Sequence, residues 1–130
     1  MSLAFIDPPN TPAPAAGYRN LAIVPAGRRL LVLAGRVGNL MDGSIVEGLE
    51  AQYWQALSNI RAIAASERGA PDDIARVTVF LIEQPTNREL IQKANKDTIP
   101  DGPPAMSWVY VAGLLLPDVK VEIEAIVAVE

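Results

Sequence analysis

The sequence predicts a single domain of the α/β (α+β) class, in which a mixed β-sheet is packed by two helices. Three observations lead to this prediction. Apolar residues recur at helical spacing between residues 47 and 68, segments on both sides of that helix are rich in β-branched residues, and turn-forming Gly and Pro separate the segments. The chain's 130 residues fit one domain of ordinary size. The predicted element order is β-β-α-β-α-β-β, and strands separated by a helix are expected to run parallel through a crossover.

The N-terminal sixteen residues contain four of the chain's eleven prolines. Because proline lacks a backbone N–H and fixes φ, this stretch is predicted to be an extended arm. A poorly ordered terminus and a role in packing are equally compatible with it. We therefore divide the chain into a proline-rich arm, residues 1–16, and a domain that covers residues 17–130.

Two strands are predicted after the arm, at residues 20–24 and 29–34. The short connection between them, Pro25-Ala26-Gly27, has the composition of a hairpin turn. The sequence therefore predicts that these two strands pair with each other.

The helix between residues 47 and 68 is the clearest element. Gly69 is a candidate for its C-terminal cap, and Pro71 prevents the helix from continuing. The apolar face of this helix is predicted to contain Tyr53, Leu57, Ile60 and Ala64.

The segment from Arg76 to Ile82 is apolar on both faces and is therefore predicted to be a central strand. Thr86 is expected to cap a second helix that runs to about Asn95. A rigid loop at residues 100–104 then leads into a strand at residues 107–112.

The last predicted strand, residues 119–129, has two different faces because alternate side chains point to opposite sides. One face is entirely apolar and is expected to lie under the helices; it consists of Val121, Ile123, Ala125, Val127 and Val129. The other face combines the charged residues Lys120, Glu122 and Glu124 with Ile126 and Ala128. Such a mixed face suits a surface that is buried only in part, for example against another subunit.

The composition excludes several kinds of chemistry. The chain has no cysteine and no histidine, which removes disulfides, thiolate nucleophiles and the usual zinc ligands, so we expect neither a metal nor a cofactor. The net charge of −4 and the scattered basic residues argue against nucleic acid as a partner. The chain shows neither an apolar run of ~20 residues nor a signal peptide, so a cytoplasmic protein without membrane association is expected.

Glu122 and Glu124 are the first candidates for a functional site. Carboxylates two residues apart on a strand point to the same side, where they are able to position a water molecule or move a proton. The competing interpretation is an ordinary solvated strand face on which Lys120 forms an ion pair.

Weaker signals come from three other segments. Tyr18 offers a phenol near the first predicted strand, with packing as the alternative role. Gly35 precedes Arg36 in a Gly-x-x-Gly segment that suits either a backbone anion site or a simple turn. Trp108 is compatible with a pocket wall or with the core. The adjacent Ser107 has no readable base that would activate it as a nucleophile.

Six segments, read together, resemble the motifs of the RidA/YjgF family. They are Gly17-Tyr18-Arg19-Asn20, Leu33-Ala34-Gly35-Arg36-Val37, the helical Q-Y-W-Q-A-L-S-N-I from Gln52 to Ile60, Arg76–Leu81, Pro104-Ala105-Met106-Ser107 and Val121–Ile126. The last two are similar to the family's P-A-R-[ST] and V-E-I-E-A-I. Because the motifs follow one another in the family's order, the chain is identified as a member of the RidA/YjgF family.

The resemblance implies a fold like that of trimeric chorismate mutase, with a homotrimer and three small-molecule clefts between its subunits. Active family members hydrolyse reactive imines or enamines and release ammonia. Endoribonuclease activity has also been described for the family, but the acidic composition here does not favour it. By resemblance, Glu122 positions the attacking water, while Tyr18 and the V-S-G segment shape the pocket.

Some positions depart from the family pattern. Met106 stands where the family has the arginine that clasps the substrate carboxylate, and Ala34 stands where it has a serine. The family's asparagine in the second helix is replaced by Gln92. Methionine cannot supply the two charge-assisted hydrogen bonds of a guanidinium, so the usual α-imino acid is not the expected substrate.

The sequence thus predicts a divergent imine or enamine deaminase, a hydrolase acting on C=N bonds, with a larger or less anionic substrate. Glu122 and Tyr18 are the predicted catalytic residues, and Arg19 or Arg36 is a candidate for a relocated anion contact. The predicted substrate-binding residues are Ala34, Gly35, Arg36, Gln92, Met106, Ser107, Trp108 and Glu124. A non-catalytic member that senses a metabolite in the same clefts is the alternative. A chorismate-mutase-like reaction ranks lower, because a dicarboxylate needs the missing cation.

Overall fold

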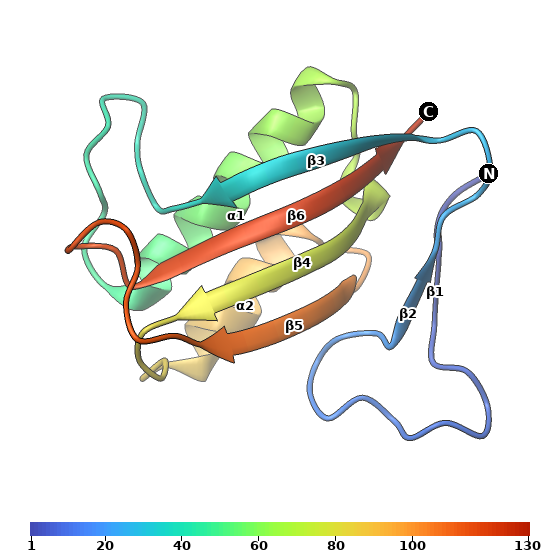
Figure 1. Ribbon diagram of the computed structural model, residues 1–130, viewed down its shortest axis with the longest axis horizontal. Helices are drawn as coiled ribbons and strands as arrows, with labels where there is room; N and C mark the ends of the chain where they lie inside the picture. The colour runs from blue at the N-terminus through green and yellow to red at the C-terminus, as the bar shows by residue number, and fades with distance from the viewer.

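The computed structural model describes residues 1–130 and contains a four-stranded sheet with two helices on one face (Figure 1). In chain order the elements are β1 (Ala4–Ile6), β2 (Leu21–Ile23), β3 (Arg29–Arg36), α1 (Leu49–Ser66), the 3₁₀ turn η1 (Pro71–Asp73), β4 (Ile74–Leu81), α2 (Arg88–Thr98), β5 (Ala105–Tyr110) and β6 (Val121–Val129). The strand order in the main sheet is β3-β6-β4-β5; β4 and β5 are parallel, and β6 is antiparallel to both β3 and β4. The mixed α+β fold class predicted from the sequence is confirmed. Neither helix has the length and apolar character that crossing a membrane requires.

The predicted hairpin between residues 20–24 and 29–34 is wrong. β2 pairs with β1 in a separate two-stranded sheet, and β3 pairs with β6. The N-terminal strand takes this place because Leu3 and Phe5 find an apolar contact surface that includes Ala128. This burial gives β2 a partner other than the strand that follows it along the chain.

The first helix begins and ends two residues inside the predicted limits, at Leu49 and Ser66. Arg68, with φ of 63°, takes the left-handed conformation after the helix. Gly69 still closes the helix end, because its N–H donates to the carbonyl oxygen of Ala64 at 2.8 Å. The predicted apolar face is confirmed, since Tyr53, Leu57, Ile60 and Ala64 are all buried in the core.

The N-terminus of α2 is capped by Asn87 rather than by Thr86. The side chain of Asn87 accepts a hydrogen bond from the N–H of Leu90 at 3.2 Å. Thr86 instead donates its N–H and its hydroxyl to the carboxylate of Glu50 in α1, and the N–H of Asn87 donates to the same oxygen. Partial burial raises the pKa of Glu50, but these hydrogen bonds outweigh it and hold the pKa below its usual range. Glu50 therefore links the start of α2 to α1.

The sheet has one covered face and one open face. The predicted apolar face of β6 lies under the helices, and its five residues all belong to the core: Val121, Ile123, Ala125, Val127 and Val129. The opposite face of the sheet, which we call the open face, is covered by no helix (Figure 1). On β3 this open face exposes Leu30 to 57% and Val32 to 76%.

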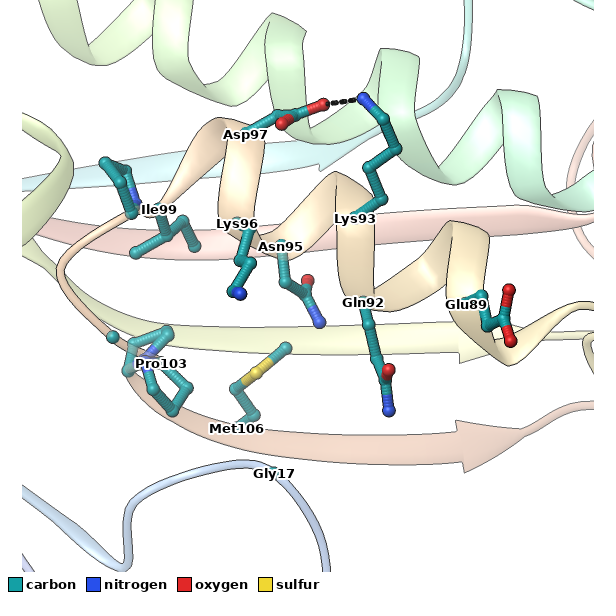
Figure 2. A pocket seen from close by; sticks show the side chains of 13 residues that line it. Gly17, Glu89, Gln92, Lys93, Asn95, Lys96, Asp97, Ile99, Pro103 and Met106 are labelled. Carbon is teal, nitrogen blue, oxygen red and sulfur yellow. Dashed lines mark hydrogen bonds and ion pairs between the residues drawn. The ribbon is translucent and has the colours of Figure 1, made fainter.

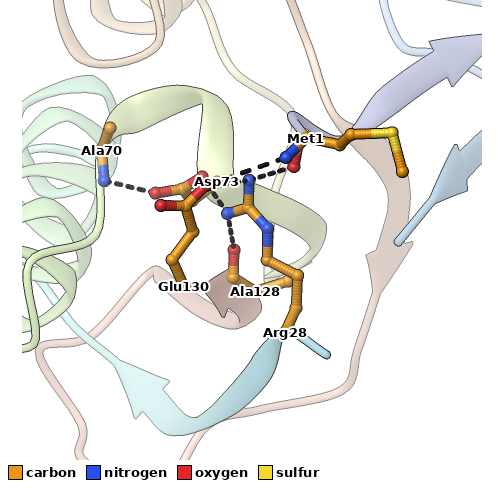
Figure 3. A network of polar contacts seen from close by, with 6 residues as sticks. All are labelled: Met1, Arg28, Ala70, Asp73, Ala128 and Glu130. Carbon is orange, nitrogen blue, oxygen red and sulfur yellow. Dashed lines mark hydrogen bonds and ion pairs between the residues drawn. The ribbon is translucent and has the colours of Figure 1, made fainter. Parts of the chain in front are cut away.

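Arg28 joins the two ends of the chain (Figure 3). Its side chain is only 7% exposed and donates to the carboxylate of Asp73 at 2.9 Å and to the carbonyl oxygen of Ala128 at 3.0 Å. It also donates to the carbonyl oxygen of Met1 and lies 3.5 Å from the carboxylate of Glu130. One guanidinium thus holds the first residue, η1 and the end of β6 together.

A single buried amide ties two loops to α1. Gln52, which is 2% exposed, donates from Nε2 to the carbonyl oxygens of Val46 and Asp118, each at 3.0 Å. Its Oε1 accepts the N–H of Lys120 at 2.8 Å. Because Val46 precedes α1 whereas Asp118 and Lys120 precede β6, this side chain fixes the entry of both elements.

Replacement of Gln52 by leucine is expected to lower the free energy of unfolding by about 3 kcal/mol, because three backbone groups lose their partners in a buried place. Urea denaturation measures the loss. The matched control is Gln55→Leu, which removes one bond to Asn59 and is expected to cost less than about 1 kcal/mol. A Gln52→Leu variant as stable as the natural chain would contradict the role given to the amide.

Candidate functional site

A cavity of about 630 Å³ opens between α2 and β5 (Figure 2). One side of α2 and the loop from Ile99 to Pro104 form its wall, and Met106 of β5 lies at its base. Gly17, in the segment that precedes β2, borders it as well. The cavity combines a methionine, several prolines and the polar side chains of one helix face.

Two residues predicted from the sequence meet in this cavity. Met106 is 6% exposed and Gln92 is exposed, and both line it. Tyr18 lies next to Gly17 but packs against the core as a half-buried side chain. Its segment is held against β5, because the N–H of Arg19 donates to the carbonyl oxygen of Pro104 at 3.1 Å.

Trp108 and Ser107, although next to Met106, do not line the cavity. Trp108 stacks on Tyr53 of α1, with ring centroids 5.4 Å apart. Ser107 lies on the open face, where its hydroxyl accepts a hydrogen bond from Arg76 at 2.9 Å. Trp108 therefore contributes nothing to the apolar lining of the cavity, which comes from Met106, Ile99 and the prolines of the loop.

Glu122 forms a second group, together with Gly35. The strands β3 and β6 change register between Leu33 and Arg36, and Gly35 lies at this irregularity. A Cβ atom built on Gly35 would lie 2.5 Å from Oε2 of Glu122, so the carboxylate occupies the space that a side chain at position 35 would take. Ala34, the residue before it, is exposed. The glycine is what allows the Glu122 carboxylate to rest on the β3 backbone.

The charged residues near Glu122 form no ion pair with it. Glu124 is exposed and lines a small hollow of about 130 Å³ on the open face. Lys120 pairs with Glu83 at 2.8 Å, so it does not neutralise Glu122. Arg36 aligns with Ile123 across the strand pair, and its buried Nε has no hydrogen-bond partner.

Asn95 and Lys96 are among the polar residues of the cavity that the sequence analysis missed. The sequence could have predicted the position of Lys96, because Gln92 and Lys96 are four residues apart and therefore share one helix face. The orientation of the Asn95 side chain is fixed by the core, because its Oδ1 accepts a hydrogen bond from the hydroxyl of Tyr53 at 2.5 Å. Burial raises the pKa of Tyr53 strongly despite this hydrogen bond, so the phenol stays protonated and continues to donate.

The two groups lie on opposite faces of the sheet. Met106 belongs to the core on the face that the helices cover, whereas Glu122 belongs to the open face. A single chain therefore does not bring Glu122 to the cavity that contains Met106. No cluster of carboxylates suited to a metal ion is present.

Comparison with known proteins identifies related chains. The family model described as Endoribonuclease L-PSP matches residues 8–129. YyfB from Yersinia pestis, a Rid-family protein of unknown function, has a TM-score of 0.87 at 27% identity, over 99% of this chain and 100% of that one. RidA from an Antarctic Psychrobacter species has a TM-score of 0.70 at 25% identity, over 97% and 99% of the two chains. TdcF from E. coli, solved with bound serine, has a TM-score of 0.69 at 26% identity, over 98% and 99%. No curated protein matches the chain.

Alanine at two glycines is expected to have different consequences. In Gly35→Ala the new methyl group displaces the flexible end of Glu122, so the free energy of unfolding is expected to fall by less than about 1 kcal/mol. In Gly38→Ala the methyl group would lie 2.6 Å from Cα of Gln52, and a loss of about 2 kcal/mol is expected. Thermal or urea unfolding compares the two. A Gly35→Ala variant less stable than Gly38→Ala would contradict the placement of Glu122.

Proposed function

This chain belongs to the Endoribonuclease L-PSP family, which includes the Rid proteins, and on that premise we propose that it is a divergent imine or enamine deaminase. The observation that carries the proposal is the Glu122 carboxylate, held against the backbone at Gly35 without a cationic side-chain partner within hydrogen-bond distance. Such a carboxylate is suited to accept a proton from water. The relative from E. coli that holds bound serine supports a ligand of amino-acid size.

The proposed reaction consumes one water molecule and releases one ammonia. Glu122 takes a proton from the water as its oxygen bonds to the imine carbon, and the electron pair of the C=N double bond moves to nitrogen, which receives that proton from Glu122. In the second half of the reaction Glu122 takes the hydroxyl proton of the carbinolamine as the carbonyl forms and the C–N bond breaks. It passes this proton to the leaving nitrogen, so ammonia departs and the carboxylate is regenerated.

We propose further that the protein is a homotrimer whose subunits meet through the open face. Leu30 and Val32 support this, because exposed apolar side chains on a sheet face are characteristic of interaction surfaces. In such an assembly each cleft combines the cavity of one chain with Glu122 and Gly35 of its neighbour. A site shared between two subunits has its two halves apart in each single chain, which agrees with the separation of Glu122 from the cavity.

The base of the cavity favours a substrate other than the smallest α-imino acids. Met106 contributes a buried thioether where the family has an arginine, so a carboxylate at this position would lack a partner. The same residue is the observation that favours a second candidate function, a ligand-binding protein without catalysis. Activity measurements separate the two candidates.

Ammonia release from freshly generated imines tests the proposed reaction. The natural chain is expected to prefer imines larger than 2-iminopropionate, and Glu122→Gln is expected to lower kcat/KM by about 100-fold, the usual effect of losing a general base. Met106→Arg is expected to shift the preference toward 2-iminopropionate. Glu47→Gln, at an exposed carboxylate that lines neither the cavity nor the open face, serves as the control and is expected to stay within a few-fold of the natural chain. Activity unaffected by Glu122→Gln would reject the deaminase mechanism, and inactivity toward every imine would favour the binding protein.

The mass in solution tests the assembly. Light scattering is expected to give about three times the 13.9 kDa of one chain. Val32→Glu, which places a charge on the open face, is expected to give smaller species. A natural chain that remains a monomer at micromolar concentration would remove the trimer and its interfacial sites.

A further inference from the structure

The cavity contains a lysine ammonium that no carboxylate of the chain neutralises. Lys96 extends from α2 into the space above Met106 (Figure 2) and takes part in no ion pair. Lys93, less than one turn earlier and also on the cavity wall, is paired with Asp97 at 2.7 Å. The remaining charged residue of the wall is Glu89, near the N-terminal end of α2. Lys96 is therefore the available cation of this cavity.

An oriented amide lies beside that cation. Because the Oδ1 of Asn95 accepts the hydroxyl of Tyr53, its Nδ2 group is turned the other way, toward the cavity (Figure 2). Tyr53 is fully buried and stacked on Trp108, so it cannot easily release the amide. The Nδ2 of Asn95 has no acceptor within the chain and offers two N–H donors.

The arginines expected from the sequence do not reach this place. Arg19 is bound to the carboxylate of Asp7 at 3.1 Å. Arg36 lies at the register change of β3 and does not line the cavity. The missing cation is therefore not restored by either of them within one chain.

We propose that Lys96 and Asn95 form an anion subsite that binds a carboxylate of the ligand, in a place different from that of Met106. The proposal deepens the proposed function, on which it rests for the identity of the site. A carboxylate accepts hydrogen bonds from both an ammonium and an amide, and charge-assisted bonds of this kind are the strong ones. The ligand is thus a small monocarboxylate whose apolar part lies on Met106 and Ile99. A second carboxylate toward the N-terminal end of α2 is disfavoured by Glu89.

A lysine at position 96 allows the substrate to carry a carboxylate although the family's arginine is replaced by Met106. Lysine is a flexible point charge that does not impose the planar, two-bond geometry of a guanidinium. It therefore accepts carboxylates at different distances from the reacting carbon. The subsite favours ligands that are longer than 2-iminopropionate over the smallest imino acid.

Binding of a matched pair of probes tests this subsite without any catalysis. Hexanoate and hexanamide have the same carbon chain and differ in charge, and NMR titration of the ¹⁵N-labelled chain gives both affinities. The natural chain is expected to bind hexanoate about 5- to 10-fold more tightly than hexanamide. Lys96→Ala is expected to remove this preference, and Lys96→Arg is expected to keep it. Arg88→Ala is the matched control, because it removes an exposed cation of the same helix that does not line the cavity, and it is expected to change both affinities by less than about 2-fold.

Lys96 is exposed on the helix surface, so its substitution is not expected to unfold the chain, and unchanged amide spectra outside the cavity verify this. Equal affinity of the natural chain for the two probes, a preference that survives Lys96→Ala, or no saturable binding of either probe would overturn the subsite. A chain that is inert toward imines but binds hexanoate through Lys96 would keep the subsite and reject the deaminase. An active chain whose probe preference ignores Lys96 would reject the subsite alone.

Discussion

The buried amide of Gln52 is the constraint on which the placement of the site depends. It bonds to backbone groups on both sides of the core, before α1 and before β6, and Gly38 packs directly against its Cα. These contacts fix where β6 starts and therefore its register. A slip of one residue would move every side chain of the strand to the other face, and Glu122 would then enter the core. The position of the carboxylate is thus determined by an uncharged side chain on a helix.

The individual elements could be predicted from the sequence, whereas their pairing could not. The spacing of Tyr53, Leu57, Ile60 and Ala64 gave the buried face of α1, and the alternation in β6 gave its covered face. Which strand pairs with β2 depends on the contacts of Leu3 and Phe5 with residues far away in the sequence. Such contacts produce no periodic pattern within the strand itself. The cap of α2 was misplaced by one residue, because Thr86 and Asn87 both have capping side chains and Glu50 of another helix decides between them.

The candidate site could be predicted in parts. The motif pattern pointed to Met106, Gln92 and Glu122, but it did not indicate that the sheet separates the first two from the third. That separation depends on the pairing of β5 and β6 with β4, which no single strand's alternation reveals. Lys96 was overlooked because an exposed lysine on a helix is the commonest of surface residues. Only the position of the helix above Met106 shows that it faces a cavity.

The two halves of the proposed site lie on opposite faces of one sheet, so the proposed catalysis depends on assembly. In the proposed site, the cavity beside α2 lies on the covered face, and the open face contributes a carboxylate that no helix of the same chain covers. Neither the cavity nor the carboxylate is sufficient for the proposed reaction by itself. The trimer is therefore proposed as part of the site and not as a separate property of the molecule.

Mixed trimers provide the most direct test of this claim. Glu122→Ala removes the carboxylate, and Gln92→Trp fills the cavity, so each variant alone is expected to be inactive. If every site joins the cavity of one chain to Glu122 of its neighbour, unfolding and refolding the two variants together at equal amounts restores about a quarter of the sites, because subunits combine at random. Ammonia release near that level is the predicted result. Mixed trimers whose activity does not exceed that of the separate variants would show that the two groups do not act across a subunit interface.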